Sequence, residues 1–323
     1  MSAPMSASIG TGGQFAVEQL SPDFGFYLRT TGLLAERRSS MQHIEIVDTP
    51  LFGRAMRIDG CFMTSERDEF FYHEPMIHLP AVTFGRPRSA LIIGGGDGGA
   101  AEELLKHPDM QRVVLAELDA DVIAMARTWL PSIHRGAFDD PRLELLIGDG
   151  RAFVEQCEER FDQIVLDLTD PFGPAVELYT REFYAACRSK LTPGGVLSLH
   201  IQSPIHRPET LARIMASLRS VFGVVRPYLQ YVPLYGTLWA MAVASDSADP
   251  LALDAATVDA RIAELGLREL QLYNGAMHQA LLAQPNFLRE LLAQPAQPIV
   301  AGDALDDPSL DPENLPALQI VSA

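Results

Sequence analysis

The sequence is poor in cysteine and contains no long apolar run. Its three cysteines, Cys61, Cys157 and Cys187, are too few and too irregularly spaced for a disulfide framework or a zinc site. No hydrophobic stretch approaches the ~20 residues of a membrane-spanning helix. The first fifteen residues lack both the basic and the apolar region of a secretory signal. We therefore expect a cytoplasmic protein with free thiols.

Positive charge is also scarce. The chain has 25 lysines and arginines against 42 aspartates and glutamates, which gives a formal net charge of −17. This excess argues against the binding of DNA, RNA or anionic lipid through broad electrostatics. It is compatible with cationic small-molecule substrates, because an acidic cleft concentrates them, although solubility alone would also explain it.

What the sequence does contain, from Pro87 onward, is an alternation of short apolar segments with segments of helical periodicity. This alternation predicts an α/β fold: a Rossmann-like, doubly wound and mostly parallel sheet of the class I methyltransferase type. Segments 224–232 and 237–244 are expected to add an antiparallel hairpin at the sheet edge. The predicted parallel strands are 90–93, 113–117, 143–147, 163–167 and 196–200, and the predicted helices begin near Gly98, Asp121, Gly150, Arg181 and Pro208.

The region before this alternation has a different pattern. Residues 41–47 alternate with a period of two, and Asp59-Gly60 predicts a hairpin turn. Segment 66–79 is predicted to be helical, although Pro75 lies within it. The 323 residues are 47% hydrophobic, which suffices for one large or two medium cores. The predicted organisation is a disordered N-terminus (1–15), a β-rich N-terminal domain (16–85), a Rossmann-like domain (86–293) and an acidic, disordered tail (294–323).

A glycine-rich loop follows the first predicted parallel strand. The run from Gly94 to Gly99 fulfils the G-x-G-x-x-G pattern, and Glu117 ends the next strand at the spacing typical of nucleotide binding. A carboxylate at that position can accept both ribose hydroxyls. Asp97 lies inside the loop, where it would repel a pyrophosphate but suit a cationic ligand. The loop therefore favours a nucleoside that carries positive charge.

Carboxylates follow or end four of the predicted strands: Asp97, Glu117, Asp149 and Asp167. Because ligands bind outside the carboxyl ends of parallel strands, we expect the four along one crevice. Asp149, between two glycines, can accept the exocyclic amine of adenine. An aspartate before a helix is also a common N-cap, so a structural role for Asp149 stays open.

A second acidic constellation begins at the end of the strand 163–167. Asp167 and Asp170 are three residues apart, and Pro171 and Pro174 restrict the loop that carries Asp170. Both carboxylates can therefore point into one cavity. An Asx-turn or a helix cap would explain Asp170 equally well, but it would leave Asp167 unexplained.

Together these motifs resemble the polyamine aminopropyltransferases, the spermidine synthase family. The resemblance rests on the strand and loop 91–99, Glu117-Leu-Asp119, Gly148-Asp-Gly150, the segment 167–175, the N-terminal segment 59–74 and Tyr273-Asn274 with His278. It extends from about Gln42 to Leu292. It implies a β-stranded N-terminal domain, a Rossmann-like catalytic domain, and homodimers or homotetramers. It also implies transfer of an aminopropyl group from decarboxylated S-adenosylmethionine to an amine, with release of methylthioadenosine and without a metal or bound cofactor.

The resemblance also implies roles for individual residues. Asp167, with Tyr72 nearby, would orient the attacking amine, and Asp97 would bind the ammonium group of the donor. Asp170 would hold the remaining cationic part of the acceptor. The implied donor-binding residues are Gln42, Gly94, Gly96, Asp97, Glu117, Asp149, Gly150 and Pro174. The implied acceptor-binding residues are Tyr72, His73, Asp97, Asp167, Asp170 and Tyr235.

The sequence departs from the family pattern at two positions. Met63 and His200 stand where relatives commonly carry glutamine, although Gln202 lies two residues after His200. These departures leave the acceptor open. We expect putrescine, which would give spermidine, with cadaverine, agmatine, spermidine or a diaminopropane as alternatives.

Other classes of function are less compatible with the acidic residues. A methyltransferase on the same sheet would use intact S-adenosylmethionine, whose carboxylate Asp97 would repel. A non-catalytic polyamine-binding protein that inherited the fold would not need every carboxylate, so their presence argues against this class. A nicotinamide-dependent oxidoreductase would place a pyrophosphate against Asp97, which would repel it. His73 and His78 suggest a zinc helix, but they are five residues apart rather than four, so we expect no metal site.

Overall fold

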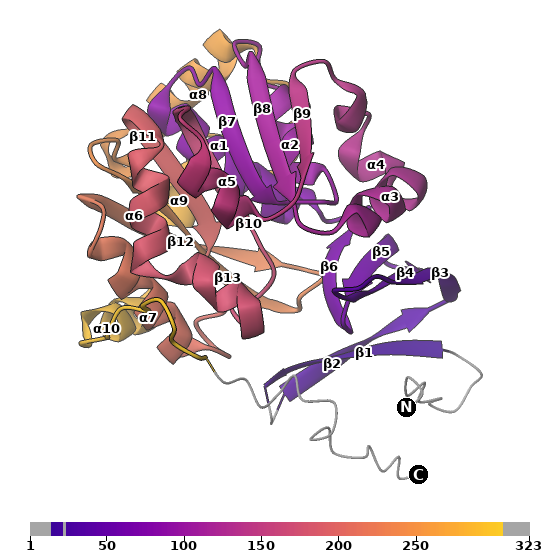
Figure 1. Ribbon diagram of the computed structural model, residues 1–323. Coiled ribbons are helices and arrows are strands. Elements are labelled where there is room, and N and C mark those ends of the chain that lie inside the picture. Colours follow the sequence, from indigo (N-terminus) through magenta and orange to yellow (C-terminus); the bar gives the residue numbers. More distant parts are fainter. Residues whose placement is uncertain (1–13, 22–23, 306–323) are drawn as a thin grey trace.

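The computed structural model describes residues 14–21 and 24–305. The N-terminus was predicted to be disordered over residues 1–15, of which 1–13 lie outside the described residues, as do residues 306–323 of the predicted tail. For Gln14 and Phe15 the prediction is wrong, because both belong to strand β1 (Gln14–Ser21). Two small antiparallel sheets form the N-terminal region, at the lower right of Figure 1. One sheet pairs β1 (Gln14–Ser21) with β2 (Phe24–Thr30), and the other has the order β3-β4-β5-β6. Its strands are β3 (Gly32–Arg38), β4 (His43–Thr49), β5 (Gly53–Ile58) and β6 (Cys61–Ser65).

The turn predicted at Asp59-Gly60 joins β5 to β6. Both residues have positive φ angles, 50° for Asp59 and 89° for Gly60, as a tight two-residue hairpin requires. The side chain of Asp59 also accepts a hydrogen bond from the backbone N–H of His43, at 2.9 Å. The turn therefore fixes the register of this sheet and brings β4 beside β5.

The predicted doubly wound sheet is confirmed. Its seven strands have the order β12-β13-β11-β10-β7-β8-β9, with parallel pairing from β11 to β9 and antiparallel pairing at β12 and β13. These strands are β7 (Ser89–Gly94), β8 (Arg112–Glu117), β9 (Leu143–Ile147), β10 (Phe161–Asp167), β11 (Leu191–His200), β12 (Val224–Val232) and β13 (Thr237–Ser245).

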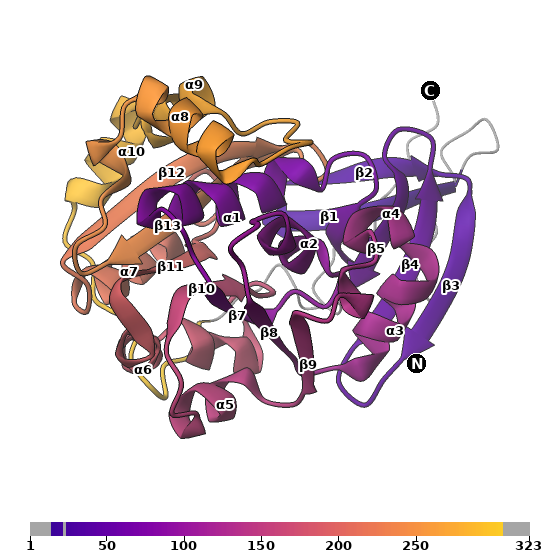
Figure 2. The ribbon, with the colours of Figure 1, turned by 90° about the horizontal axis from the view of Figure 1, so that it is seen from above.

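Helices cover both faces of this sheet, as Figure 2 shows from above. Successive residues of a strand point to opposite faces, so Ile92 packs into one hydrophobic cluster while Leu91 and Ile93 pack into the other. The first cluster includes α1 (Phe70–Phe84), α2 (Gly99–Leu105), α3 (Ala120–Trp129), α4 (Pro131–His134), α8 (Ala255–Leu265) and α9 (Gly275–Leu282). The second includes α5 (Gly150–Gln156), η2 (Gly173–Tyr179), α6 (Arg181–Ser189), α7 (Pro208–Arg219) and α10 (Asn286–Ala293). Within the described residues, none of the helices has the length and apolarity needed to cross a membrane.

Helix α1 starts later than predicted and packs against the large sheet. It begins at Phe70 and ends at Phe84, with Pro75 and Pro80 inside it. We predicted segment 66–79 as the end of the N-terminal domain. The helix instead contacts β10, β11 and β12, and its Met76, Ile77 and Leu79 are fully buried. Because the helix is buried along nearly its whole length, it lacks the polar face that would show which side turns toward solvent. The sequence therefore does not indicate which sheet it packs against.

The prediction of a tail from residue 294 is wrong for residues 294–305. Ile299 is fully buried in the cluster that contains α7 and α10. Its N–H donates a 2.8 Å hydrogen bond to Ser217 Oγ, and its carbonyl accepts one from the N–H of Arg181, at 2.9 Å. The ion pair of Arg213 with Asp303 extends this contact. A single buried isoleucine cannot produce a periodic pattern, so this packing could not be predicted from the sequence.

Candidate active site at the switch point of the sheet

The site lies where the chain changes direction between β7 and β10. From β7 the chain continues to β8 and β9 on one side of the sheet, and from β10 it continues to β11 on the other. Ligands of doubly wound sheets bind at such a switch point. Gly94 at the end of β7 pairs with Asp167 at the end of β10. At Gly94 φ is 79°, and a Cβ would lie 2.1 Å from the carbonyl oxygen of Asp167, so only glycine fits.

Asp97 and Asp167 approach one buried imidazole. Asp97 Oδ2 lies 3.5 Å from His73 Nε2, and Asp167 Oδ2 lies 4.0 Å from the same nitrogen. Asp97 Oδ1 accepts a 3.0 Å hydrogen bond from the N–H of Gly99, which fixes the carboxylate within its loop. The structure thus brings together residues from α1, from the loop after β7 and from the end of β10.

The His73 imidazole is buried among carboxylates that favour its protonated form. Its Nδ1 lies 2.9 Å from Glu69 Oε2, and the residue is 2% exposed. Burial lowers the pKa of His73, but the carboxylates of Asp97, Glu69 and Asp167 outweigh burial and raise it to about 10. The ring packs on the glycine loop, because a Cβ at Gly99 would lie 2.3 Å from His73 Cε1. Sequence analysis missed Glu69, although it lies in the motif at 59–74.

Asp167 is a buried carboxylate with a tyrosine partner. Burial raises the pKa of Asp167 to about 6, and the neighbouring Asp97 adds to the rise, whereas His73 and a hydrogen bond from Tyr72 oppose it. Asp167 is therefore mostly ionised at neutral pH and can accept a hydrogen bond from a ligand. The Tyr72 ring lies 6.2 Å from that of Tyr235, so both predicted tyrosines line the same region.

Tyr235 is anchored by the backbone of Met63. Its hydroxyl donates a 2.7 Å hydrogen bond to the Met63 carbonyl, while the Met63 side chain packs against the core. The tyrosine anchor therefore depends on the backbone at position 63 and not on the side chain there.

Residues at the end of β8 contact both the glycine loop and the N-terminal region. Burial raises the pKa of Glu117 to about 7, and its Oε1 accepts a hydrogen bond from the N–H of Asp119 at 2.9 Å. A Cβ at Gly96 would lie 2.8 Å from Glu117 Oε2, so the loop needs glycine there. Gln42 Nε2 donates to Asp119 Oδ2 at 3.1 Å, and Ser39 Oγ donates to the same oxygen at 2.6 Å.

The next strand end carries Asp149, which acts as a helix N-cap. Asp149 Oδ1 accepts a 2.8 Å hydrogen bond from the N–H of Arg151 at the start of α5. The structural role that the sequence left open is therefore present, and the exposed side chain lies on the predicted rim. Gly150 packs tightly on β7, since a Cβ there would lie 2.5 Å from Ile93 Cγ2. Pro174 lies in η2, on the segment that follows Asp170.

A second acidic region lies beyond Asp167. Asp170 Oδ1 accepts a 2.8 Å hydrogen bond from Gln202 Nε2, and both residues line a cavity together with Glu18 and Trp239. Glu18 is a buried carboxylate on β1, and its Oε2 accepts a hydrogen bond from the N–H of Phe62 at 2.7 Å. Burial raises the pKa of Glu18 to about 8 despite that bond. Sequence analysis missed Glu18, because only the alternation of β1 marks its position as buried.

His200 supports the loop between the two acidic residues. Its Nε2 lies 2.9 Å from the carbonyl oxygen of Leu168 and 2.7 Å from the Tyr179 hydroxyl, which itself donates to the Thr169 carbonyl at 2.9 Å. Burial lowers the pKa of His200, so a neutral ring donates from Nε2. His200 thus holds the backbone of the loop, whereas Gln202 reaches Asp170.

One group of side chains in the described part of the chain has a spacing compatible with a metal ion. Ligand atoms of His73, Asp97 and Asp167 all lie within 4.8 Å of one another. A protonated imidazole has no lone pair for a metal, and the raised pKa of His73 keeps it protonated. His78 points elsewhere, with Nε2 at 2.8 Å from Glu103 and Nδ1 at 3.0 Å from His107.

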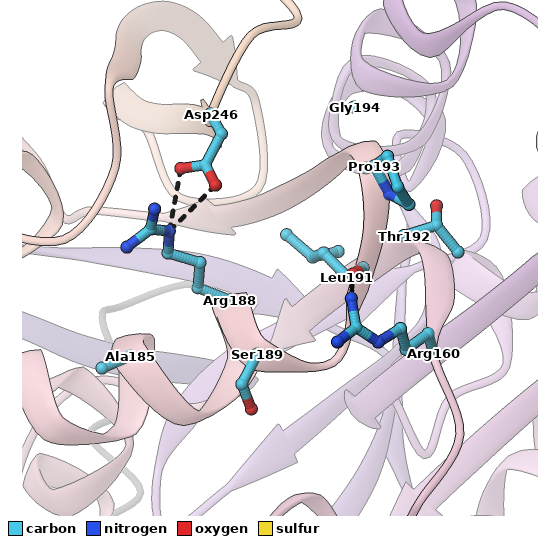
Figure 3. Close-up of a pocket in the computed structure, with 10 residues that line it drawn as sticks. Arg160, Ala185, Arg188, Ser189, Leu191, Thr192, Pro193, Gly194 and Asp246 are labelled. Atoms are coloured by element: carbon cyan, nitrogen blue, oxygen red, sulfur yellow. Dashed lines mark hydrogen bonds and ion pairs between the residues drawn. The ribbon is translucent and has the colours of Figure 1, made fainter.

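A larger cavity, of about 480 Å³, lies at the opposite edge of the sheet (Figure 3). It is lined by Arg160, by the first residues of β11 and by Asp246. Arg188 is neutralised there by Asp246, at 2.8 Å, and Arg160 donates to the Leu191 carbonyl, at 3.4 Å. This cavity lies beside the amino ends of β10 and β11, away from the switch point, and we assign it no role.

Comparison with known proteins agrees with this geometry. Residues 69–253 match the family model described as the spermine/spermidine synthase domain, and residues 15–66 match the spermidine synthase tetramerisation domain. The polyamine aminopropyltransferase of Nitrosomonas europaea is 71% identical over 307 residues, which cover 95% of this chain and 94% of that protein. The enzyme of the same name from Bacillus subtilis is 34% identical over 276 residues, or 85% of this chain and 97% of that protein.

Solved structures show the same architecture. A spermidine synthase in complex with the transition-state analogue AdoDATO superimposes with a TM-score of 0.81 at 34% identity, and covers 86% of this chain and 94% of that one. The spermidine synthase of Thermotoga maritima gives 0.79 at 33% identity, with coverages of 86% and 93%. Because the matches include both the β-rich region and the doubly wound sheet, the chain belongs to the spermine/spermidine synthase family of polyamine aminopropyltransferases.

Proposed function

We propose that this protein transfers an aminopropyl group from decarboxylated S-adenosylmethionine to putrescine, and releases spermidine and methylthioadenosine. The observation that carries the proposal is the pair Asp97 and Asp167, which face each other across one buried cation at the switch point. The donor has an ammonium group next to its reacting chain, and the acceptor has an ammonium at each end. Paired carboxylates suit both.

In the proposed reaction the acceptor nitrogen attacks the carbon next to the donor sulfur. The new C–N bond forms as the C–S bond breaks, and the electron pair of that bond neutralises the sulfonium. An ammonium has no lone pair, so the acceptor must first lose a proton. An amine with a pKa near 10 is a much stronger base than Asp167. Asp167 therefore acts mainly by accepting the hydrogen bond that orients the neutral amine, with Tyr72 fixing the carboxylate. The proton leaves to solvent.

Selection of the donor is assigned to the glycine loop. Asp97 would pair with the donor ammonium and repel the carboxylate of intact S-adenosylmethionine. Glu117 would accept the ribose hydroxyls, with Gln42 holding the adjacent Asp119 in place. Asp149 would accept the adenine amine through the carboxylate that also caps α5. The reaction proposed here uses the donor as a co-substrate and asks for no metal or resident cofactor.

Binding of the second acceptor ammonium is assigned to Asp170. Glu18 lines the same cavity, but burial and the charge of Asp170 raise its pKa to about 8, so at neutral pH it is mostly protonated and would accept the ammonium through its carbonyl oxygen. A four-carbon diamine with its first nitrogen at Asp167 would direct its second nitrogen toward them. A longer triamine would need additional room along the same cavity.

Mass spectrometry of reaction products tests the proposal. The purified protein is incubated with decarboxylated S-adenosylmethionine and equimolar putrescine, cadaverine, agmatine, spermidine and diaminopropane, and in parallel with intact S-adenosylmethionine. We expect methylthioadenosine and spermidine in the first reaction and no product in the second. A dominant product from another amine would replace putrescine as the acceptor, and methylated amine with S-adenosylhomocysteine would refute aminopropyl transfer.

We further propose that the N-terminal strands join copies of the chain into homodimers or homotetramers, in the cytoplasm. The region that matches the tetramerisation domain exposes several large apolar side chains, which a contact between copies would bury. These are Phe24, Tyr27, Leu33, Leu34 and Met41. Light scattering of the purified protein measures the oligomer size.

A further inference from the structure

His73 is a buried cation enclosed by carboxylates in a site proposed to bind cations. Its Nδ1 is 2.9 Å from Glu69, and its Nε2 faces Asp97 at 3.5 Å and Asp167 at 4.0 Å. The two carboxylates nearest Nε2 are the groups that the proposed function assigns to the donor ammonium and the attacking amine. The ring packs closely on Gly99, where a Cβ would lie 2.3 Å from its Cε1.

We propose that, before the donor binds, the His73 imidazolium takes the place of the donor ammonium beside Asp97, and that donor binding expels the proton from His73 Nε2 to solvent. The inference rests on the proposed function, because it needs a donor that carries an ammonium group. Glu69 keeps the proton on Nδ1, so the neutral ring would present a lone pair at Nε2 toward Asp97. That lone pair can accept an N–H from the ammonium.

The balance of the step is one proton for one ammonium. The free protein with protonated His73 binds the donor, the ammonium takes its place beside Asp97, and one proton leaves to the buffer. The driving force is repulsion between two cations beside the same carboxylates, which lowers the pKa of the imidazole. Before the donor binds, that pKa is about 10, so the ring is protonated at neutral pH at the start of this step.

The surroundings of His73 support a change of one group only. Asp167 has a pKa of about 6, so above pH 7 it stays ionised. Arg135 Nη2 lies 3.6 Å from Glu69 Oε1, so this carboxylate faces a second cation on the side away from His73. Several ionisable groups of the described residues face His73. Its own helix and the residues just before it contribute Asp68, Glu69 and Tyr72. The packed elements contribute Asp97 after β7, Asp167 of β10 and, through its contact with Glu69, Arg135.

Isothermal titration calorimetry of the full-length protein tests the inference. Decarboxylated S-adenosylmethionine is titrated at pH 8 in phosphate and in Tris, whose ionisation enthalpies differ, so the difference in heat counts the protons released. We expect close to one proton for each donor bound. Donor affinity should then rise by about tenfold per pH unit between pH 7 and 8.5, which is the linkage relation for one proton.

Two controls isolate His73. Methylthioadenosine has the same nucleoside but no ammonium, so we expect it to bind without releasing the proton of His73. Any proton that Glu117 releases or takes up on contact with the nucleoside is measured in the same titration and can be subtracted. The variant His73→Gln keeps an amide in place of the ring, and we expect it to bind methylthioadenosine, which verifies its fold, and to bind the donor without proton release. His43→Gln removes a histidine of β4 instead and should release the proton as the wild type does.

The outcomes separate the two proposals. Donor binding by the wild type with no more proton release than methylthioadenosine shows would overturn the inference and leave the proposed function standing. Unchanged proton release in His73→Gln would also overturn it, since another group would be the source. If the wild type binds methylthioadenosine but not the donor, the proposed function fails and the inference fails with it.

Discussion

The donor side and the acceptor side of this site are built in different ways. On the donor side Asp97, Glu117 and Asp149 each follow a strand of the same sheet, and the backbone next to each carboxylate supplies its hydrogen bond. On the acceptor side Asp170 is held by Gln202. Glu18 comes from β1, far away in the sequence.

This difference separates contacts that depend on residues close together in the sequence from contacts that depend on the packing of distant segments. In the proposed assignment, the donor contacts loops whose shape depends on glycines within a few residues of each carboxylate. The proposed acceptor contacts come from side chains that meet only when the N-terminal strands dock on the large sheet. We therefore expect donor-side substitutions to act on one substrate with little effect on the rest of the fold, and acceptor-side substitutions to couple to the packing of β1 and β6.

The largest effect is expected at Asp167, which lies between the two sides. Asp167→Asn keeps the shape but loses the charge that orients the attacking amine, so kcat should fall about 10²–10⁴-fold. The KM for the donor should change much less. Steady-state kinetics with putrescine measures both. Asp109→Asn is the matched control, because Asp109 forms a surface ion pair with Arg86 away from the site. Normal turnover in Asp167→Asn would refute the mechanism.

Substitutions on the two sides should have opposite signatures. Asp97→Asn removes a charged hydrogen-bond partner of the donor, which is worth about 1.5–3 kcal/mol, so the donor KM should rise about 10–100-fold with the acceptor KM nearly unchanged. Asp170→Asn should instead raise the acceptor KM, by roughly tenfold, and leave donor binding unchanged. The two KM values of each variant test the contrast. If either variant raised both KM values equally, the two sides would not be separable.

An effect on stability rather than on catalysis is expected from Glu18. Its pKa is about 8 in the folded protein, against 4.5 for an unburied glutamate, so the folded state binds more protons in between. The wild type should therefore lose stability as pH rises from about 5 to 8, by up to about 1.4 kcal/mol per pH unit. Glu18→Gln removes this titration. Thermal unfolding is measured at pH 5.5 and pH 8.5, and the stability of the variant relative to the wild type should be greater at pH 8.5. The same stability difference at both pH values would contradict the raised pKa of Glu18.

Much of the donor side could be predicted from the sequence. Asp97 and Glu117 lie at fixed spacings from apolar segments, and parallel strands carry the residues at their carboxyl ends to one edge of the sheet. The hairpin at Asp59-Gly60 was equally predictable, because few residues adopt two successive positive φ angles.

Other features had no local pattern. The sequence placed α1 with the N-terminal strands, although it packs on the large sheet and carries Tyr72 and His73 into the site. It also left unassigned the helices α8, α9 and α10, whose apolar faces are short. His200 was recognised as a departure from the family, but its hold on the Leu168 carbonyl depends on the neighbouring strand and loop.

The sequence by itself determined the class of fold, the family and the order of the carboxylates along the sheet, because these depend on periodicity and on residues close together in the chain. Only the tertiary structure decided that Glu18 joins Asp170 in one cavity and that Glu69, Asp97 and Asp167 enclose His73. The physical reason is that the charge of a buried group depends on every carboxylate within a few ångströms. Those neighbours come from segments that only the packing of the whole chain brings together.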